Sequence, residues 1–235
     1  MSVGIVFVSH SPKIAEGLVD LARQMAPDAK LFAAGGTDDD GIGTSFQRVS
    51  DGIAAVDDGE GVVVLCDLGS AILTAETALD FLEDEQRARV RIVDAPLVEG
   101  GVAASVAAQT GSSLDDVVAA ARSANVVGDA DADSAVAAPD APAGAPTGDD
   151  GIVTATVTLL NKDGLHARPA AEFVKLASTF GAKVTVNGKD AKSLLGIMAL
   201  GLTKGADVSL TADGPDAAAA VDALTALITS GFGEL

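Results

Sequence analysis

At residues 162–171 the sequence reads Lys162-Asp163-Gly164-Leu165-His166-Ala167-Arg168-Pro169-Ala170-Ala171, which brings a histidine and an arginine to a predicted helix start. Proline has a fixed φ and no N–H, so it suits the first turn of a helix, where free N–H groups need outside partners. We therefore expect a helix to begin at Arg168 or Pro169. A phosphate on His166 would then meet free N–H groups, the helix dipole and the Arg168 guanidinium.

His166 has the chemistry of a phosphoryl acceptor. At neutral pH a histidine keeps an unprotonated ring nitrogen for much of the time, so it can attack phosphorus without a separate base. The adduct is a labile phosphoramidate, which suits a relay better than a hydrolase. The alternative is a histidine that only caps a helix or hydrogen-bonds in a turn. The arginine and proline at the same helix start favour the phosphate site.

The segment from about Val153 to the C-terminus resembles HPr, the histidine phosphocarrier of the bacterial phosphoenolpyruvate:sugar phosphotransferase system. Three motifs carry the resemblance, at residues 164–170, 191–201 and 206–208. It implies that His166 is the phosphorylated residue and that Arg168 is its phosphate partner. In some HPr proteins the serine at the place of Ser193 is a regulatory phosphorylation site. A serine before Leu194 is also an ordinary helix N-cap, so both readings stay open.

The element order of this C-terminal segment agrees with that resemblance. The alternation of residues 154–159 predicts a strand, and Val184 to Val186 followed by Asn187-Gly188 predicts a strand entering a hairpin turn. A short helix over 193–200, a strand over 207–212 and an amphipathic helix over 215–229 complete the order βαββαβα. We expect an α+β open-faced sandwich, with an antiparallel sheet and its helices on one face.

The first half of the chain alternates apolar runs with helical patterns. Short apolar runs predict strands at residues 4–9, 29–34, 61–66 and 90–94. Thr44 or Ser45 caps one of the intervening helices, whose spacing places Phe46 and Ile53 inward. This alternation predicts an α/β domain with a doubly wound, mostly parallel sheet and helices on both faces.

Two polar residues follow strands of this predicted sheet. His10 lies in the loop after the first strand, and Asp67 follows the most apolar run, at 61–66. Open α/β sheets place their ligands at the carboxyl edge of the strands, so both residues belong to a candidate site. Asp67 could also only cap the helix that follows it, and Ser70 could be a cap and nothing more.

Five ordered motifs in residues 1–123 resemble the DhaM family, the phosphotransfer subunits of the phosphoenolpyruvate-dependent dihydroxyacetone kinase. They lie at residues 8–11, 41–44, 67–71, 75–79 and 95–100. The first domain of that family belongs to the mannose-type IIA group. The resemblance implies that His10 is phosphorylated, that Asp67 orients its imidazole, and that Thr44, Gly69 and Ser70 line the phosphate. It also implies a homodimer through residues 1–123.

The composition excludes several other classes of protein. The aromatic share is 3%, without Trp or Tyr, so stacking surfaces for nucleic acid are hard to assemble. The net charge of −19 argues against binding to nucleic acid or anionic membranes. Cys66 is the only cysteine, and the two histidines lie in different domains, so we expect no disulfide, no metal site and no permanently bound cofactor. No signal peptide or membrane span is recognisable, which indicates a cytoplasmic protein.

Between the two domains lies a segment of Ala, Gly, Pro and Asp. We expect domains at residues 1–123 and 152–235, with a flexible acidic linker at 124–151 that is too polar and too rich in proline to fold. Residues 1–123 carry 20 acidic and 8 basic side chains, whereas residues 152–235 carry 8 and 7. A nearly neutral carrier that docks on an acidic partner avoids repulsion between like charges.

Together these features predict a phosphohistidine relay, a phosphotransferase subunit of the phosphotransferase system. The resemblances imply that a separate enzyme I phosphorylates His166 with phosphate from phosphoenolpyruvate, and that His166 passes it to His10. His10 would then phosphorylate ADP bound on a DhaL-type subunit, which acts with a DhaK-type subunit on dihydroxyacetone. Two alternatives remain open at this point: a mannose-type sugar IIA component, and an adaptor whose phosphorylation state regulates another protein.

Overall fold

The computed structural model of the chain describes residues 2–127, 152–162 and 164–234. These residues form two compact units, divided between Asn125 and Val126, and each is described by itself. The expected linker lies outside the described residues from 128 to 151. None of the helices in the described ranges is both long and apolar enough to cross a membrane.

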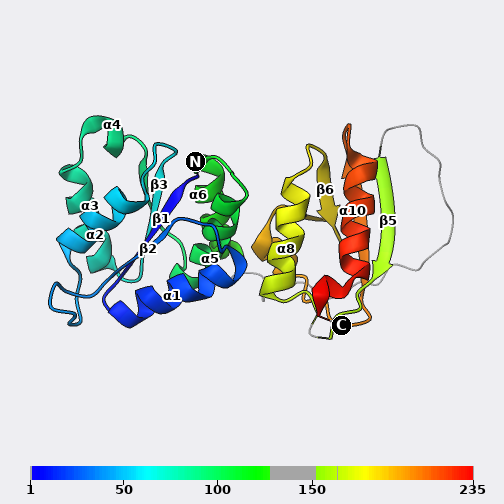
Figure 1. Cartoon of the computed structure of the whole chain (residues 1–235), viewed down its shortest axis with the longest axis horizontal. Coiled ribbons are helices and arrows are strands. Elements are labelled where there is room, and N and C mark those ends of the chain that lie inside the picture. The colour runs from blue at the N-terminus through cyan, green and yellow to red at the C-terminus, as the bar shows by residue number, and fades with distance from the viewer. Residues whose placement is uncertain (1, 128–151, 163, 235) are drawn as a thin grey trace. The chain divides into compact units, whose positions relative to one another are not determined.

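The first unit is built on a four-stranded parallel sheet with the order β2-β1-β3-β4 (Figure 1). Its strands are β1 (Gly4–Ser9), β2 (Leu31–Gly35), β3 (Val62–Cys66) and β4 (Val90–Val93). The chain moves outward to β2 after β1 and to β4 after β3. The gap between β1 and β3 is therefore the topological switch point, where open α/β sheets bind their ligands.

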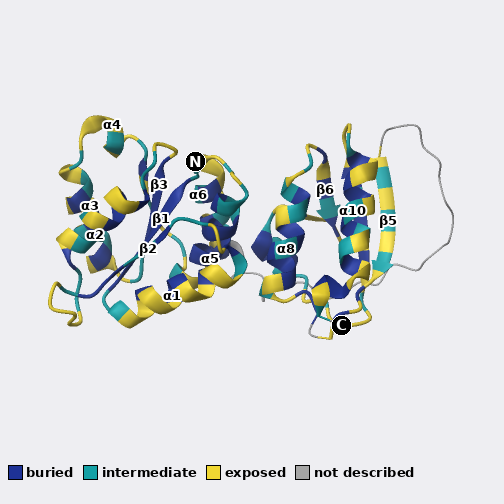
Figure 2. Cartoon of the chain, viewed as in Figure 1, coloured by how far each residue is buried: buried dark blue, intermediate teal, exposed yellow. Residues whose placement is uncertain are grey.

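Helices cover both faces of this sheet, which confirms the expected doubly wound α/β fold. Helices α1 (Pro12–Met25), α5 (Leu97–Gln109) and α6 (Leu114–Arg122) pack together on one face, and α2 (Phe46–Val56) and α3 (Gly69–Asp80) pack together on the other. The short helix α4 (Asp84–Arg87) precedes β4. Strand β1 is buried along its whole length, as the dark ribbon in Figure 2 shows. Central parallel strands are apolar on both sides because both faces are covered.

The core is filled by small and branched side chains, as the low aromatic content requires. On the α2/α3 face, Val6 and Val64 of the sheet pack with Ile53 and with alanines of α3 such as Ala75. On the other face, Phe7 is fully buried, and a Cβ on Gly101 of α5 would come within 2.7 Å of its ring. Glycine at that position therefore lets α5 approach the sheet closely.

Two details of the first unit differ from the sequence-based expectation. Phe46 does not point into the core: it is 38% exposed and packs edge-on against Phe81, with ring centroids 5.2 Å apart. Its place at the first position of α2 leaves it beyond the end of the helix–helix contact, where the 3.6-residue period no longer decides burial. Helical structure also continues past residue 123 into α7 (Ala124–Val127), because Ala124 is buried and the Asn125 side chain donates to the Asp94 carbonyl.

The second unit has the expected order βαββαβα and the expected antiparallel sheet. Its strands β5 (Ile152–Thr158), β6 (Lys183–Val186), β7 (Lys189–Asp190) and β8 (Asp207–Asp213) pair in the order β5-β8-β6-β7. Its helices are α8 (Ala167–Ser178), α9 (Leu194–Met198) and α10 (Ala217–Thr229), followed by the 3₁₀ turn η1 (Gly231–Gly233). Burial alternates along β8, so one face of the sheet packs on helices and the other is open.

The hairpin between β6 and β7 follows the predicted turn chemistry. Asn187 and Gly188 have φ values of 46° and 81°, and Val186 pairs with Lys189 across them. Two successive residues with positive φ are what a tight hairpin requires, and Asn-Gly is the pair that adopts them most easily. The Asn187 side chain also accepts a hydrogen bond from the Ser209 N–H, which ties the turn to β8.

Candidate active site

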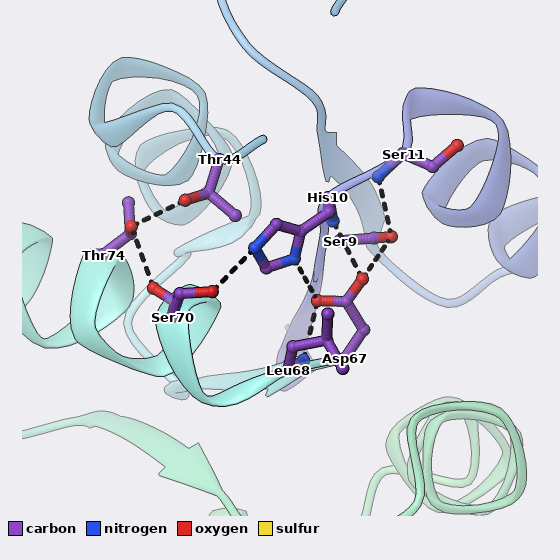
Figure 3. Close-up of polar contacts among 8 residues, drawn as sticks. All are labelled: Ser9, His10, Ser11, Thr44, Asp67, Leu68, Ser70 and Thr74. Atoms are coloured by element: carbon purple, nitrogen blue, oxygen red, sulfur yellow. Dashed lines mark hydrogen bonds and ion pairs between the residues drawn. The ribbon is translucent and has the colours of Figure 1, made fainter. Parts of the chain in front are cut away.

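His10 and Asp67 meet at the switch point of the first sheet. His10 follows β1 and Asp67 follows β3, and these strands are neighbours in the sheet. The two side chains are joined by a contact of 2.9 Å between His10 Nδ1 and Asp67 Oδ1 (Figure 3). The Asp67 N–H also donates to the Val8 carbonyl, which extends the strand pairing as far as the site.

Asp67 accepts four hydrogen bonds, so its orientation is fixed. Besides the imidazole, the donors are the Ser9 hydroxyl, the His10 N–H and the Leu68 N–H, each at 2.8 Å. Burial by itself would raise the pKa of Asp67, but the bonds from His10, Ser9 and Leu68 outweigh it and hold that pKa below its usual value. The residue is therefore a carboxylate at neutral pH. It is not an N-cap, because the cap position of α3 is Leu68.

This carboxylate decides which nitrogen of His10 can react. A carboxylate can only accept hydrogen bonds, so Nδ1 of the imidazole must carry a proton. In the neutral ring Nε2 then holds the lone pair, and the Ser70 hydroxyl, 2.8 Å away, donates to it. Nε2 is thus the nucleophilic atom, and it faces the first turn of α3.

The first turn of α3 offers donors to an anion on Nε2. Gly69 and Ser70 are its first two residues, and among the described residues their N–H groups find no acceptor. The positive end of a helix of 12 residues binds phosphate through such groups. Of the residues that the sequence singled out, the structure brings Gly69 and Ser70 to this side of the imidazole.

Thr44 lies in the same region, but its contact is with a helix and not with the histidine. Its hydroxyl is 2.7 Å from that of Thr74, a residue of α3 that the sequence reasoning missed. The loop that carries Thr44 is tied down by the Gly43 N–H, which donates to the His10 carbonyl, and by Arg48, which donates to the Gly35 carbonyl.

Ser9 is a second residue that the sequence reasoning missed. It is fully buried at the end of β1, where its hydroxyl donates to Asp67 and accepts from the Ser11 N–H. A serine as the last residue of an otherwise apolar strand, directly before a histidine, was the available signal.

His166 occupies the N-cap position of α8, one residue earlier than the expected helix start allows. Proline needs only to fall within the first turn, so Ala167 and Arg168 can precede Pro169 in the helix. The loop before His166 is held by the buried Asn161, whose amide donates to the Gly164 carbonyl, and by the Leu165 N–H, which donates to the Leu202 carbonyl. Sequence reasoning missed Asn161 as well.

A carboxylate also contacts the second histidine, but at the other nitrogen. The Glu234 carboxylate lies 3.0 Å from His166 Nε2, and this pair is partly exposed. Glu234 follows η1, where Phe232 is buried with a φ of 55°. With Nε2–H donated to Glu234, the lone pair of the neutral ring lies on Nδ1. No described residue hydrogen-bonds to Nδ1.

Neither Arg168, the expected phosphate partner, nor Ser193, the possible regulatory site, contacts His166 among the described residues. The Arg168 guanidinium is 63% exposed and lies 3.7 Å from Glu172, one turn along the same helix. Ser193 is the N-cap of α9, where its hydroxyl accepts from the Gly196 N–H at 3.1 Å. This hydrogen bond supports the interpretation of Ser193 as a helix N-cap.

Comparison with known proteins agrees with the two units. The family model described as "PTS system fructose IIA component" matches residues 4–118, and the one described as "PTS HPr component phosphorylation site" matches residues 153–230. The phosphocarrier protein HPr of Cupriavidus necator is 48% identical over 81 residues, which cover 33% of this chain and 91% of that protein.

Proteins named as DhaM match either the whole chain or its first unit. The phosphoryl donor subunit DhaM of a PEP-dependent dihydroxyacetone kinase from Klebsiella michiganensis is 38% identical over 245 residues, covering 99% of this chain and 51% of that protein. The chain therefore spans about half the length of this relative. A DhaM subunit of Listeria innocua is 45% identical over 105 residues, covering 44% of this chain and 84% of that protein. On these matches the chain belongs to the DhaM family, in a form that joins a IIA-type domain to an HPr domain.

Proposed function

We propose that the chain is a phosphohistidine relay in which His166 receives a phosphoryl group from enzyme I and passes it to His10. His10 then gives it to ADP bound on a DhaL-type subunit that works with a DhaK-type subunit on dihydroxyacetone. The observation that carries the proposal is the Asp67–His10–Ser70 arrangement, which leaves the nucleophilic Nε2 facing the N–H groups of α3. A second histidine at a helix N-terminus in the same chain supplies the donor.

The transfer from His166 to His10 exchanges one nitrogen–phosphorus bond for another. The Nε2 lone pair of His10 attacks the phosphorus of phospho-His166, the bond from phosphorus to Nδ1 of His166 breaks, and its electron pair returns to that nitrogen. Asp67 holds the proton on Nδ1 of His10 throughout, so it stabilises the positive charge that develops on the ring. In the last step a β-phosphate oxygen of ADP attacks, and the electron pair returns to Nε2.

The two sites hold the phosphoryl group by different means. At His10 the described donors are N–H groups and hydroxyls, whereas His166 has Arg168 two residues away. Phosphoryl transfer depends mainly on positioning and on stabilising charge on the equatorial oxygens, and both sets of donors can supply that.

The test compares His166→Ala and His10→Ala in the full chain, with phosphoenolpyruvate, enzyme I and the kinase subunits. We expect His166→Ala to block loading by enzyme I, and His10→Ala to allow loading of His166 but to stop phosphorylation of dihydroxyacetone. Dihydroxyacetone phosphorylation that continues with His10→Ala would overturn the proposed order.

A sugar-transport IIA component is the second candidate, because the model that matches residues 4–118 is described as a fructose IIA component. Such a protein would hand its phosphoryl group to a IIB domain instead of to bound ADP. Incubating the phosphorylated chain with either acceptor separates the two functions. We also propose a homodimer through residues 1–123, which light scattering of the purified chain tests directly.

A further inference from the structure

Thr74 has no part in the relay described above, yet its hydroxyl lies on the Nε2 side of His10, together with those of Thr44 and Ser70 (Figure 3). The three residues come from two elements: Thr44 from the loop after β2, and Ser70 and Thr74 from α3. Thr74 touches both other residues. Its Oγ1 is 2.7 Å from Oγ1 of Thr44 and 3.2 Å from the backbone carbonyl oxygen of Ser70.

The two threonine hydroxyls can be arranged in two ways. Each hydroxyl has one hydrogen to donate. If Thr74 donates to the Ser70 carbonyl, Thr44 donates to Thr74 and has no hydrogen left for another acceptor. If Thr74 donates to Thr44 instead, the Thr44 hydrogen is available. A phosphoryl group on His10 would supply the acceptor that makes the second arrangement favourable.

We propose that Thr74 is a positioning residue for the phosphoryl group on His10, an inference that rests on the proposed function. Thr74 joins the loop of Thr44 to the helix that carries Ser70, and it turns the Thr44 hydroxyl toward the phosphoryl oxygens once they arrive. The hydroxyls of Thr44 and Ser70 and the N–H groups of Gly69 and Ser70 then surround the phosphoryl group, and the Thr74 hydroxyl holds that of Thr44 in place.

Thr77 offers a matched control on the same helix. Like Thr74, it donates its hydroxyl hydrogen to the carbonyl four residues earlier, that of Leu73, at 2.8 Å. Thr77 is exposed and touches neither Thr44 nor Ser70 among the described contacts. A change to valine therefore removes the same type of bond from α3 at both positions, but it removes the contact with Thr44 only at Thr74.

The experiment uses the full chain with His166→Ala, so that His10 is the one remaining histidine. Phosphoramidate serves as a small phosphoryl donor, and the rate of His10 phosphorylation is followed by mass spectrometry. Thr74→Val should lower the rate about fivefold, the size expected for the loss of one hydrogen bond of about 1 kcal/mol. Thr74→Ser and Thr77→Val should stay within about twofold of the parent.

The outcomes separate this inference from the proposed function. If the parent is phosphorylated normally but Thr74→Val and Thr77→Val react at equal rates, the role of Thr74 is overturned and the proposed function is not. Failure of Thr74→Ser to restore the rate also overturns this role, because a serine keeps the hydroxyl. A parent that takes up no phosphoryl group on His10 overturns the proposed function itself, and this inference with it.

Discussion

Replacing Asp67 by asparagine should slow phosphoryl transfer to His10 severely, although the two side chains have nearly the same shape. Asp67 Oδ1 accepts from His10 Nδ1 and from the Leu68 N–H, and Oδ2 accepts from the Ser9 hydroxyl and the His10 N–H. An asparagine must place its NH₂ group at one of these two positions. At either position a donor then faces two donors.

A change of imidazole tautomer relieves the repulsion between the asparagine NH₂ group and the Nδ1–H donor. If the NH₂ group faces His10, Nδ1 becomes the acceptor and the proton moves to Nε2, which removes the lone pair that attacks phosphorus. A hydrogen bond to a charged group is worth about 1.5–3 kcal/mol, so transfer should slow by about 10- to 150-fold. The rate is measured by rapid quench with radioactive phospho-carrier, and the tautomer by ¹⁵N chemical shifts of the His10 ring.

Asp94→Asn is the matched control for this substitution. Asp94 is exposed directly after β4, the strand next to β3, so it lies at the same edge of the sheet but touches neither His10 nor Asp67 among the described contacts. Its substitution removes the same charge from the same domain. Transfer rates within twofold of each other for Asp67→Asn and Asp94→Asn would refute the tautomer argument, provided that both variants unfold at similar temperatures.

Three further outcomes can be measured on the purified chain. Gly164→Ala should lower the free energy of unfolding of the second unit by about 1–3 kcal/mol more than Gly201→Ala does, as measured by urea titration. Both glycines have positive φ, but only at 164 would an added Cβ lie 2.3 Å from a backbone oxygen. Equal losses of unfolding free energy in the two variants would contradict this. Glu234→Ala should change the ratio of the two neutral tautomers of His166, measured by ¹⁵N chemical shifts, by about two- to fivefold. This is the range for a partly exposed pair worth at most about 1 kcal/mol. An unchanged ¹⁵N spectrum of the His166 ring would contradict the contact with Glu234. Burial raises the pKa of the Cys66 thiol to about 12. The rate at which Cys66 is alkylated should therefore keep rising with pH well beyond 9 in the folded chain, because the thiolate is the reactive form. A plateau of this rate near pH 9 would instead show a thiol with an ordinary pKa.

The sequence predicted the backbone of the first site because strand ends are easy to recognise. Apolar runs end at Ser9 and Cys66, and parallel strands bring their carboxyl ends to one edge, so His10 and Asp67 were expected near each other. The family resemblance implied that Asp67 orients the imidazole, but the other three hydrogen bonds to Asp67 were not expected. Three of the four bonds to Asp67, those from Ser9 and His10, depend on β1 and β3 being direct neighbours, and the order of strands in a sheet does not follow from the order in the chain.

Contacts made between separate elements account for the residues that were missed. Thr74 matters because α3 comes close enough to the loop of Thr44 for two hydroxyls to meet, and a helical period carries no information about such an approach. Glu234 reaches His166 through a turn that contains Phe232 with positive φ, a conformation that no propensity assigns to phenylalanine. Phe46 was placed inward by its spacing, but at the first position of α2 it packs against Phe81 and stays partly exposed.

The two histidines are alike in chemistry but use opposite nitrogens, and this difference suits the direction of the proposed transfer. Asp67 fixes Nδ1 of His10 and leaves Nε2 reactive, whereas Glu234 holds Nε2 of His166 and leaves Nδ1 reactive. Nδ1 lies next to the carbon that joins the ring to its own backbone, so a phosphoryl group there lies close to the start of α8. Nε2 is an outer atom of the ring. In-line transfer needs an acceptor that approaches phosphorus from the side opposite to the donor nitrogen, and an outward Nε2 meets this condition with less steric hindrance than a second Nδ1 would.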